Sequence, residues 1–267
     1  MGKSASVPNE GLAALIRREI RAGRHDTVTA GMASGYLQAN LVVLPVDWAD
    51  EFEEYCAANA KSCPLLSRGR PGDPRFPDLA DDLDVRTDIP RYRVFRDGLE
   101  ISEQTDICDV WCNDLVAFAI GCSYSFEAAL LDAGVPIRHI EQGKKVCTYL
   151  TAIDTVPAGR LSGKLVVSMR NFTTPNAIRA IEITSRFPRV HGGPIHLGDP
   201  SEIGIADIDR PEFGGEPDIR AGEIPVFWAC GVTPQVVVEK ARPPLCITHK
   251  AGHMLITDRL NEEFRES

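Results

Sequence analysis

Two short stretches of the sequence repeat the same set of reactive side chains. Residues 121–127 read GCSYSFE and residues 229–235 read ACGVTPQ, so each cysteine is followed by a hydroxyl three positions later and by Glu or Gln five positions later. Thiols, hydroxyls and a carboxyl group are the groups used for nucleophilic attack, for holding an oxyanion and for general acid–base catalysis. The spacing therefore predicts two related halves of one site for acid–base chemistry.

Each stretch must be positioned by the apolar segment before it and the one after it. LVAFAI (115–120) and IPVFWA (224–229) are short and rich in β-branched and aromatic residues, which favours strands. Pro234 suits the first helical position, which makes Thr233 the predicted N-cap and, by alignment, Ser125 the other. Two such helix starts would direct N–H groups and partial positive charge into one cleft, where a dicarboxylate could bind. The plainer alternative is that the hydroxyls only cap helices and the cysteines only pack.

The residues of the two stretches have distinct predicted roles. Glu127 is the predicted general acid or base, because apolar neighbours would raise its pKa. Ser125 and Thr233, with adjacent N–H groups, would form the oxyanion site. Cys122 and Cys230 are candidate nucleophiles or acids, with core packing as the alternative.

A second set of residues is expected to bind the substrate. Arg170 ends the apolar segment LVVSMR, where a guanidinium could hold a carboxylate with two hydrogen bonds; a surface ion pair is the alternative. The loop RFPRVHGGPIHLGDP (186–200) is rich in Gly and Pro and contains further polar groups. The complete set of expected substrate-binding residues is Ser123, Gln235, Ser168, Arg170, Arg186, His191, His196 and Asp199.

Neither a metal nor a cofactor is predicted. His191 and His196 are five positions apart, which is not a standard metal-ligand spacing, and no His-Glu-x-x-His motif occurs. The glycine-rich motifs that bind dinucleotides or nucleotide phosphates are also absent. Acid–base chemistry without a cofactor is therefore the predicted class of reaction.

Composition narrows the classes of protein and partner. The 267 residues are 43% hydrophobic and 25% charged, with a net charge of −9 and no long basic run, so a nucleic-acid partner is not expected. Apolar runs are much shorter than the roughly 20 residues of a membrane span. Eight cysteines without a Cys-x-x-Cys pair favour a reduced, cytoplasmic protein, and homo-oligomerisation is left open. The opening MGKSAS also matches the short N-myristoylation pattern.

The predicted class is α/β: a mixed-sheet core with an internal pseudo-repeat and an inserted, smaller α+β subdomain. Residues 39–45 predict a buried strand, and residues 47–60 predict a helix capped by Asp47 that buries an apolar face. Asp97-Gly98 predicts a hairpin turn. Residues 1–138 and 222–267 are assigned to the core domain, and residues 139–221 to the inserted subdomain.

Several long blocks of the sequence resemble a known family. They are RTDIPRYRV, DLVAFAIGCSYSFEAAL, RHIEQGK, VVSMR, ITSRFPRVHGGPIHLGDP, PVFWACGVTPQ and THKAGHMLITD. Together they are similar to the D-glutamate cyclase family, whose bacterial members are regarded as hydro-lyases. The resemblance implies an activity like that of a longer mitochondrial relative, which cyclises D-glutamate to 5-oxo-D-proline with loss of water. It implies no agreed catalytic residues.

Two other functions remain open at this stage. One is dehydration of a different hydroxy acid. The other is binding of a small carboxylate or anion without turnover, which needs hydrogen-bond donors but no titrating group.

Overall fold

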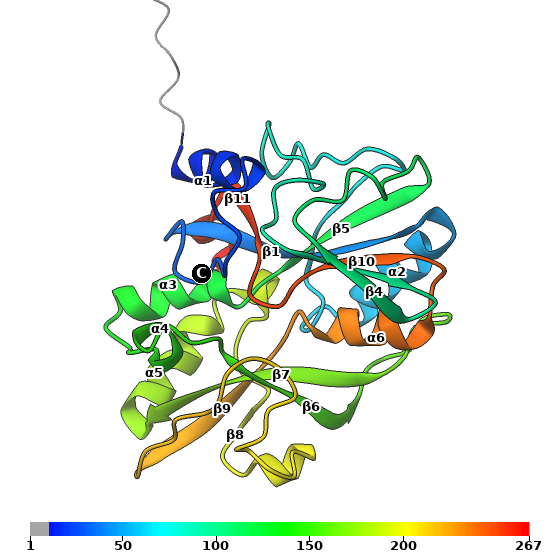
Figure 1. Ribbon diagram of the computed structural model, residues 1–267. Coiled ribbons are helices and arrows are strands. Elements are labelled where there is room, and N and C mark those ends of the chain that lie inside the picture. The colour runs from blue at the N-terminus through cyan, green and yellow to red at the C-terminus, as the bar shows by residue number, and fades with distance from the viewer. Residues whose placement is uncertain (1–10, 267) are drawn as a thin grey trace, which may run out of the picture.

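Two antiparallel β-sheets form the framework of this computed structural model, which describes residues 11–266 (Figure 1). The larger sheet has the order β2 (Leu65–Arg68), β5 (Leu115–Gly121), β1 (Tyr36–Pro45), β10 (Cys246–His249), β3 (Tyr92–Arg96) and β4 (Leu99–Gln104), and β11 (Leu255–Leu260) also pairs with β1. The smaller sheet has the order β6 (Cys147–Asp154), β7 (Lys164–Thr173), β9 (Glu223–Ala229) and β8 (His196–Leu197). The MGKSAS pattern lies outside the described residues.

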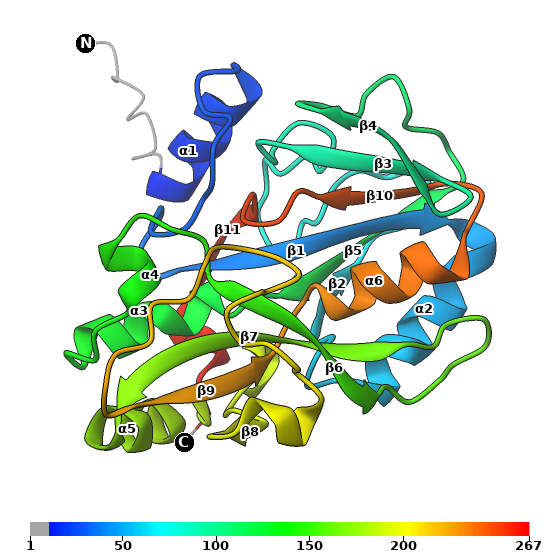
Figure 2. The same ribbon diagram turned by 60° about the horizontal axis from the view of Figure 1, so that its bottom comes forward.

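In the described part of the chain, residues 11–266, six α-helices pack around and between these sheets. They are α1 (Leu12–Arg21), α2 (Val46–Ala58), α3 (Tyr124–Asp132), α4 (Arg138–Glu141), α5 (Thr174–Thr184) and α6 (Thr233–Ala241). Short 3-10 turns cover Pro188–Val190, Pro200–Ile203 and Asn261–Phe264. Helix α6 contacts β7 of one sheet and β10 of the other, and α3 contacts β1 and α5. Both views show α3 and α6 between the two sheets (Figure 2).

The main hydrophobic core is shared by the two sheets. Leu41 of β1 and Ala119 of β5 belong to the same buried cluster as Trp228 of β9 and Phe172 of β7. The strands of residues 139–221 pair in the smaller sheet, but β9, which was assigned to the core domain, pairs with them. The division of the chain at residue 221 therefore stays a prediction.

The local elements expected from the sequence are largely confirmed. Strand β1 is buried along nearly its whole length, and β3 and β4 form a hairpin in which Asp97 (φ 49°) and Gly98 (φ 79°) occupy the left-handed region. Helix α2 buries Trp48 and Phe52 as expected. The predicted cap Asp47 is wrong, because α2 already begins at Val46 and no side chain caps it. No helix within residues 11–266 is long and apolar enough to cross a membrane.

Both repeated stretches form a strand, a turn and a helix, as β5–α3 and β9–α6. The predicted caps are wrong, because Ser123 and Val232 occupy the N-cap positions. The Ser125 hydroxyl instead accepts a hydrogen bond from Gln38 N at 3.1 Å, and the Thr233 hydroxyl accepts one from Val166 N at 3.0 Å.

These two hydroxyls therefore tie each helix start to a neighbouring strand, β1 for α3 and β7 for α6. The two units share this local geometry. An internal repeat over the rest of the chain stays a prediction.

Candidate active site

A small cavity of ≈ 50 Å³ lies between the starts of α3 and α6. Cys122, Ser123 and Tyr124 line it from the start of α3, and Cys230 and Val232 line it from the start of α6. The two stretches that repeat in the sequence therefore meet at one cavity. Helix N-termini carry unsatisfied N–H groups and partial positive charge, so this position favours a bound anion.

Other predicted site residues lie behind the cavity wall. Ser125, Glu127, Thr233 and Gln235 are buried but do not line the cavity. Ser125 and Thr233 are held by strand backbone, so they are not free to bind an oxyanion as expected. Ser125 and Thr233 have a structural role, because these hydrogen bonds orient the two helix starts.

The cavity lining also contains a cation, Lys145, which is not among the residues predicted from the sequence. Within residues 11–266 its ammonium group makes no hydrogen bond or ion pair. It reaches the cavity from the turn before β6, close to Gly252 on the opposite segment. No periodicity or motif in the sequence indicates this contact, because it depends on how the two sheets pack.

Arg170 and Glu127 form a buried ion pair beneath the cavity. Arg170 Nε donates to Glu127 Oε1 at 3.0 Å, and Arg170 Nη2 contacts the same oxygen. The two residues are 4% and 3% exposed, and the guanidinium carbon lies 5.2 Å from the centre of the Phe126 ring and 5.4 Å from that of Trp228. Such a pair, removed from water and stacked on aromatic rings, holds both partners in fixed positions.

The geometry contradicts the roles expected for Glu127 and Arg170. Burial favours a raised pKa for Glu127, but Arg170 and His139, whose Nε2 lies 3.2 Å from Glu127 Oε1, outweigh burial and lower the pKa below its usual value. The predicted rise in pKa is wrong, and Glu127 is an ionised partner of Arg170. Arg170 in turn uses its guanidinium on protein groups rather than on a substrate carboxylate.

Ser123 connects this ion pair to the cavity. Arg170 Nη2 donates to Ser123 Oγ at 3.1 Å, and Nη1 donates to Ser168 Oγ at 3.2 Å. Arginine has no acceptor, so the hydrogen of the Ser123 hydroxyl is not used in this contact. Ser123 is 4% exposed and lines the cavity, which makes it a fixed hydrogen-bond donor to whatever the cavity contains.

Both cavity cysteines are protonated at neutral pH. Burial raises the pKa of Cys122 and of Cys230, and the backbone N–H groups of Tyr124 and Val232 oppose that rise. The Tyr124 hydroxyl is also a neutral donor, because burial raises its pKa. The cavity therefore offers neutral proton donors and the cation Lys145, an arrangement suited to an anionic ligand.

Gln235 supports a histidine that the sequence argument did not assign to the site. His249 Nδ1 accepts a hydrogen bond from Leu41 N at 3.1 Å, and Gln235 Nε2 lies 2.9 Å from the same nitrogen. His249 lines the cavity, and burial lowers its pKa to about 4. The imidazole is thus neutral, and because Nδ1 accepts, Nε2 carries the hydrogen.

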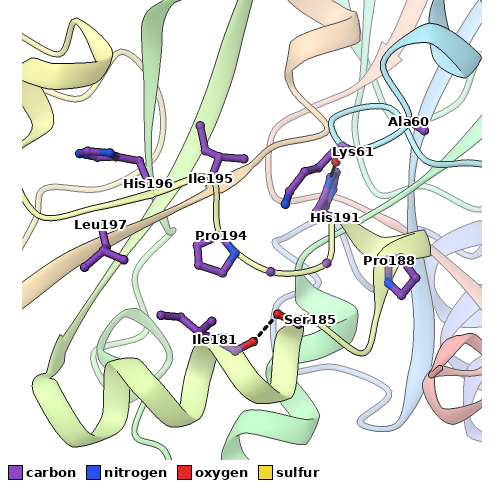
Figure 3. Close-up of a pocket in the computed structure, with 12 residues that line it drawn as sticks. Ala60, Lys61, Ile181, Ser185, Pro188, His191, Pro194, Ile195, His196 and Leu197 are labelled. Atoms are coloured by element: carbon purple, nitrogen blue, oxygen red, sulfur yellow. Dashed lines mark hydrogen bonds between the residues drawn. The ribbon is translucent and has the colours of Figure 1, made fainter. Parts of the chain in front are cut away.

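The loop after α5 lies apart from this cavity, contrary to expectation. His191 and His196 line a separate surface groove of ≈ 580 Å³. Figure 3 shows His191 beside Lys61 in this groove. His191 Nδ1 lies 3.0 Å from Lys61 O, and burial lowers its pKa to about 4. His196 Nε2 lies 2.7 Å from the Asp199 carbonyl oxygen.

Asp199 and Arg186, which were also expected to bind the substrate, lie away from this cavity. The Asp199 carboxylate accepts a hydrogen bond from Ser201 N, which lowers the pKa of Asp199. Arg186 is exposed at another hollow. Arg186, His191, His196 and Asp199 therefore do not line the cavity between α3 and α6. Within residues 11–266, no cluster of three or more His, Cys, Asp or Glu side chains could hold a metal ion.

Gly231, which takes the place of Ser123 in the second stretch, is predicted not to tolerate a side chain. A Cβ added there would lie 2.1 Å from Asn40 Nδ2, and Asn40 is buried and donates to Gly121 O at 2.8 Å. We expect Gly231→Ala to destabilise the protein by about 1–3 kcal/mol, as overpacking typically does. Urea unfolding tests this, with Gly134→Ala as a control at a glycine that has open space but a φ of 72°. If Gly231→Ala destabilises the protein no more than the control does, the Asn40 side chain moves to make room for the methyl group and the prediction is wrong.

Comparison with known proteins places the chain in a family. The D-glutamate cyclase family model matches residues 116–258. A Bordetella petrii protein named "Putative hydro-lyase Bpet2233" is 60% identical over 255 residues, which cover 96% of this chain and 97% of that protein. Similarly named proteins of Verminephrobacter eiseniae (55% identical; 92% and 90% covered) and Cupriavidus taiwanensis (57% identical; 96% and 95% covered) also match. A solved nitrogen repressor-like protein from Methanococcus jannaschii matches 95% of this chain and 100% of its own, with a TM-score of 0.38 and 10% identity, too distant to inform function. On the family match and these close relatives, the chain belongs to the D-glutamate cyclase family.

Proposed function

We propose that the protein is a hydro-lyase that interconverts D-glutamate with 5-oxo-D-proline and water in the cavity between α3 and α6. One observation carries the proposal. Two helix N-termini and the ammonium group of Lys145, which has no partner within residues 11–266, converge on a single cavity. An amino acid with two carboxyl groups presents negative charge that such a site would attract.

The carboxylate, the oxyanion and the departing oxygen each have a candidate group in the cavity lining, and the amine attacks in its neutral form after giving its extra proton to water. Lys145 and the N–H groups at the helix starts would hold the α-carboxylate. The Ser123 hydroxyl, whose oxygen is engaged by Arg170, would donate to the oxyanion that forms when the amine attacks the distal carboxyl carbon. The Tyr124 hydroxyl and the two thiols are neutral and could protonate the departing oxygen. Glu127 then acts as a positioning residue through Arg170.

The size of the cavity implies that binding moves part of its wall. A volume of ≈ 50 Å³ holds only a few water molecules, which is less than a five-carbon amino acid needs. The wall opposite the helix starts consists of connecting segments at residues 145–146, 213–214 and 251–254. Phe213 is bridged to Thr148 of β6 by two backbone hydrogen bonds. The segments at 145–146 and 251–254 lie outside strands and helices, so these two can shift without disturbing sheet pairing. We infer that substrate enters by displacing them.

Anion binding without turnover is the second candidate function. It is favoured by the ion pair of Glu127, because the carboxyl group expected to act as acid or base is already ionised and bound to Arg170. The two functions differ in what happens to bound substrate. Incubating the protein separately with D-glutamate and with 5-oxo-D-proline, and following the ring-proton signals by NMR, distinguishes them. Interconversion supports the hydro-lyase, and saturable binding of either compound without interconversion supports the binding protein.

Lys145→Met should weaken substrate binding much more than it slows the bound reaction. A hydrogen bond to a charged group contributes about 1.5–3 kcal/mol, so we expect KM for D-glutamate to rise roughly 10- to 100-fold. The neighbouring Lys144→Met is the matched control, because Lys144 is exposed and does not line the cavity. Steady-state kinetics of both variants test the assignment. Equal KM values for the two variants would remove Lys145 from the binding site.

A further inference from the structure

One side chain in the lining of the α3–α6 cavity presents a hydrogen-bond acceptor. Asn40, in the middle of β1, is 3% exposed and lines the cavity. Its Nδ2 lies 2.8 Å from Gly121 O and 3.4 Å from Ile120 O, both on β5. Because a carbonyl oxygen can only accept, the amide atom that faces β5 must be the NH2 group. The contacts with β5 therefore fix which branch of the amide carries the oxygen.

The oxygen of this amide has no donor. Within residues 11–266 no group donates to Asn40 Oδ1, and the atom is reached from the cavity rather than sealed in the core. A Cβ built on Gly231 would lie 2.9 Å from Oδ1, so the oxygen lies against the turn before α6. A buried acceptor without a donor costs free energy unless something in the cavity donates to it. The oxygen therefore indicates that the occupant of the cavity carries a hydrogen-bond donor.

Most of the cavity lining favours negative charge. The Lys145 ammonium group, the Nε2–H group of His249 and the two helix starts offer hydrogens or positive charge. These groups can bind a carboxylate, but the amino group of the same ligand brings hydrogens of its own and, when protonated, a positive charge that Lys145 repels. An amide oxygen carries partial negative charge and no hydrogen, so it can accept an N–H group. Asn40 is thus complementary to the part of an amino acid that the rest of the lining disfavours.

We propose that Asn40 Oδ1 accepts a hydrogen bond from the α-amino group of the bound ligand, and that this contact makes the cavity selective for amino acids over dicarboxylates that lack an amine. This inference rests on the proposed function, since it concerns the same cavity and the same substrate class. An amide is not basic enough to take a proton, so Asn40 binds and orients the amine without changing its protonation state. A neutral amine that gives one N–H to Oδ1 cannot direct its lone pair at that oxygen. The lone pair therefore stays available for the distal carboxyl carbon.

The experiment compares ligands that differ only in the amine. D-glutamate and glutarate form one pair of probes. D-aspartate and succinate form a second pair, in which ring closure would need a strained four-membered ring and turnover cannot distort the measurement. Calorimetric titration of the full-length protein gives Kd for each probe. We expect the wild type to bind the amine-bearing member of each pair roughly 10- to 100-fold more tightly, as a charge-assisted hydrogen bond typically allows. Asn40→Ala should lose this preference while its affinity for glutarate changes little.

A matched variant controls for the loss of packing and of backbone contacts. Gln38 lies two residues earlier in β1 and is 4% exposed, and its Nε2 also donates to two backbone carbonyls, Thr29 O at 3.1 Å and Met32 O at 3.0 Å. Gln38 does not line the cavity, so Gln38→Ala should keep the wild-type preference for the amine. Equal wild-type affinities within the pairs, or a preference that Asn40→Ala retains, would overturn the inference. Loss of glutarate binding in Asn40→Ala would also overturn it, because Asn40 would then shape the cavity rather than select for the amine.

The same measurements separate this inference from the proposed function. Binding of glutarate by the wild type with no preference for the amine contradicts the role of Asn40 and leaves dicarboxylate binding in the cavity intact. A preference that depends on Asn40, without formation of 5-oxo-D-proline from D-glutamate, supports the inference and contradicts the hydro-lyase. If none of the four probes binds to the wild type, both are wrong.

Discussion

Glu127→Gln should lower the free energy of unfolding by about 3–5 kcal/mol, the usual cost of removing one partner of a buried ion pair. The substitution leaves the Arg170 guanidinium positive in surroundings where both residues are almost fully excluded from water. A glutamine oxygen can still accept one hydrogen bond, but it cannot compensate the charge. Chemical denaturation of the wild type and the variant measures the difference.

A double variant separates charge compensation from packing. In Glu127→Gln/Arg170→Met the buried charge is removed together with its partner, and the methionine can fill the space over Phe126 and Trp228. Replacing both members of a buried pair with groups of similar volume is often close to neutral, so the double variant should regain much of the lost stability. If the single variant is as stable as the wild type, the ion pair does not hold the cavity wall as described.

Acid should destabilise the protein between about pH 6.5 and pH 4 through two buried histidines. Burial lowers the pKa of His191 and of His249 from 6.5 to about 4. Between these two pH values the histidines are protonated in the unfolded chain but neutral in the folded protein. Their contribution to the free energy of unfolding is therefore fully present above pH 6.5 and is lost as the pH falls towards 4. A shift of this size corresponds to about 3 kcal/mol for each histidine.

The contribution of the two histidines to the pH dependence of stability is measured by comparing the wild type with a variant that lacks both imidazoles. Carboxylates also take up protons in acid, but they are the same in the wild type and in a His191→Gln/His249→Gln variant. The unfolding free energy of both, determined in urea at pH 7.5, 6 and 5, should fall more steeply for the wild type. Parallel curves would mean that the two imidazoles are protonated as easily in the folded protein as in the unfolded chain.

The sequence predicted the elements around the site better than the contacts within it. The strands before Cys122 and Cys230, and the helices after them, follow from short apolar runs and from Pro234. Local propensity is sufficient for that, because each element spans fewer than a dozen residues. The cap positions were wrong because Ser125 and Thr233 bond to β1 and β7, and strands that are distant in sequence leave no local signal.

The roles of individual site residues depended on long-range packing. Glu127 was expected to be a general acid or base with a raised pKa because its sequence neighbours are apolar, but its ion-pair partner Arg170 lies 43 residues away in the sequence and lowers that pKa. Lys145 was not among the predicted site residues, and it lines the cavity because the segment before β6 lies against both helix starts. His191 and His196 share a polar loop that suggested function, yet that loop lies along a different groove. Only Cys122, Ser123 and Cys230 of the predicted site residues line the cavity.

A crystal structure of the protein soaked with 5-oxo-D-proline tests the central claim most directly, namely that the cavity between the starts of α3 and α6 is the active site. The account predicts ligand density between the two helix starts, with the carboxylate within hydrogen-bond distance of Ser123 Oγ and Lys145 Nζ and with the connecting segment at 251–254 displaced. Ligand bound in the groove beside His191 and Pro194, with the α3–α6 cavity closed and unchanged, would contradict it.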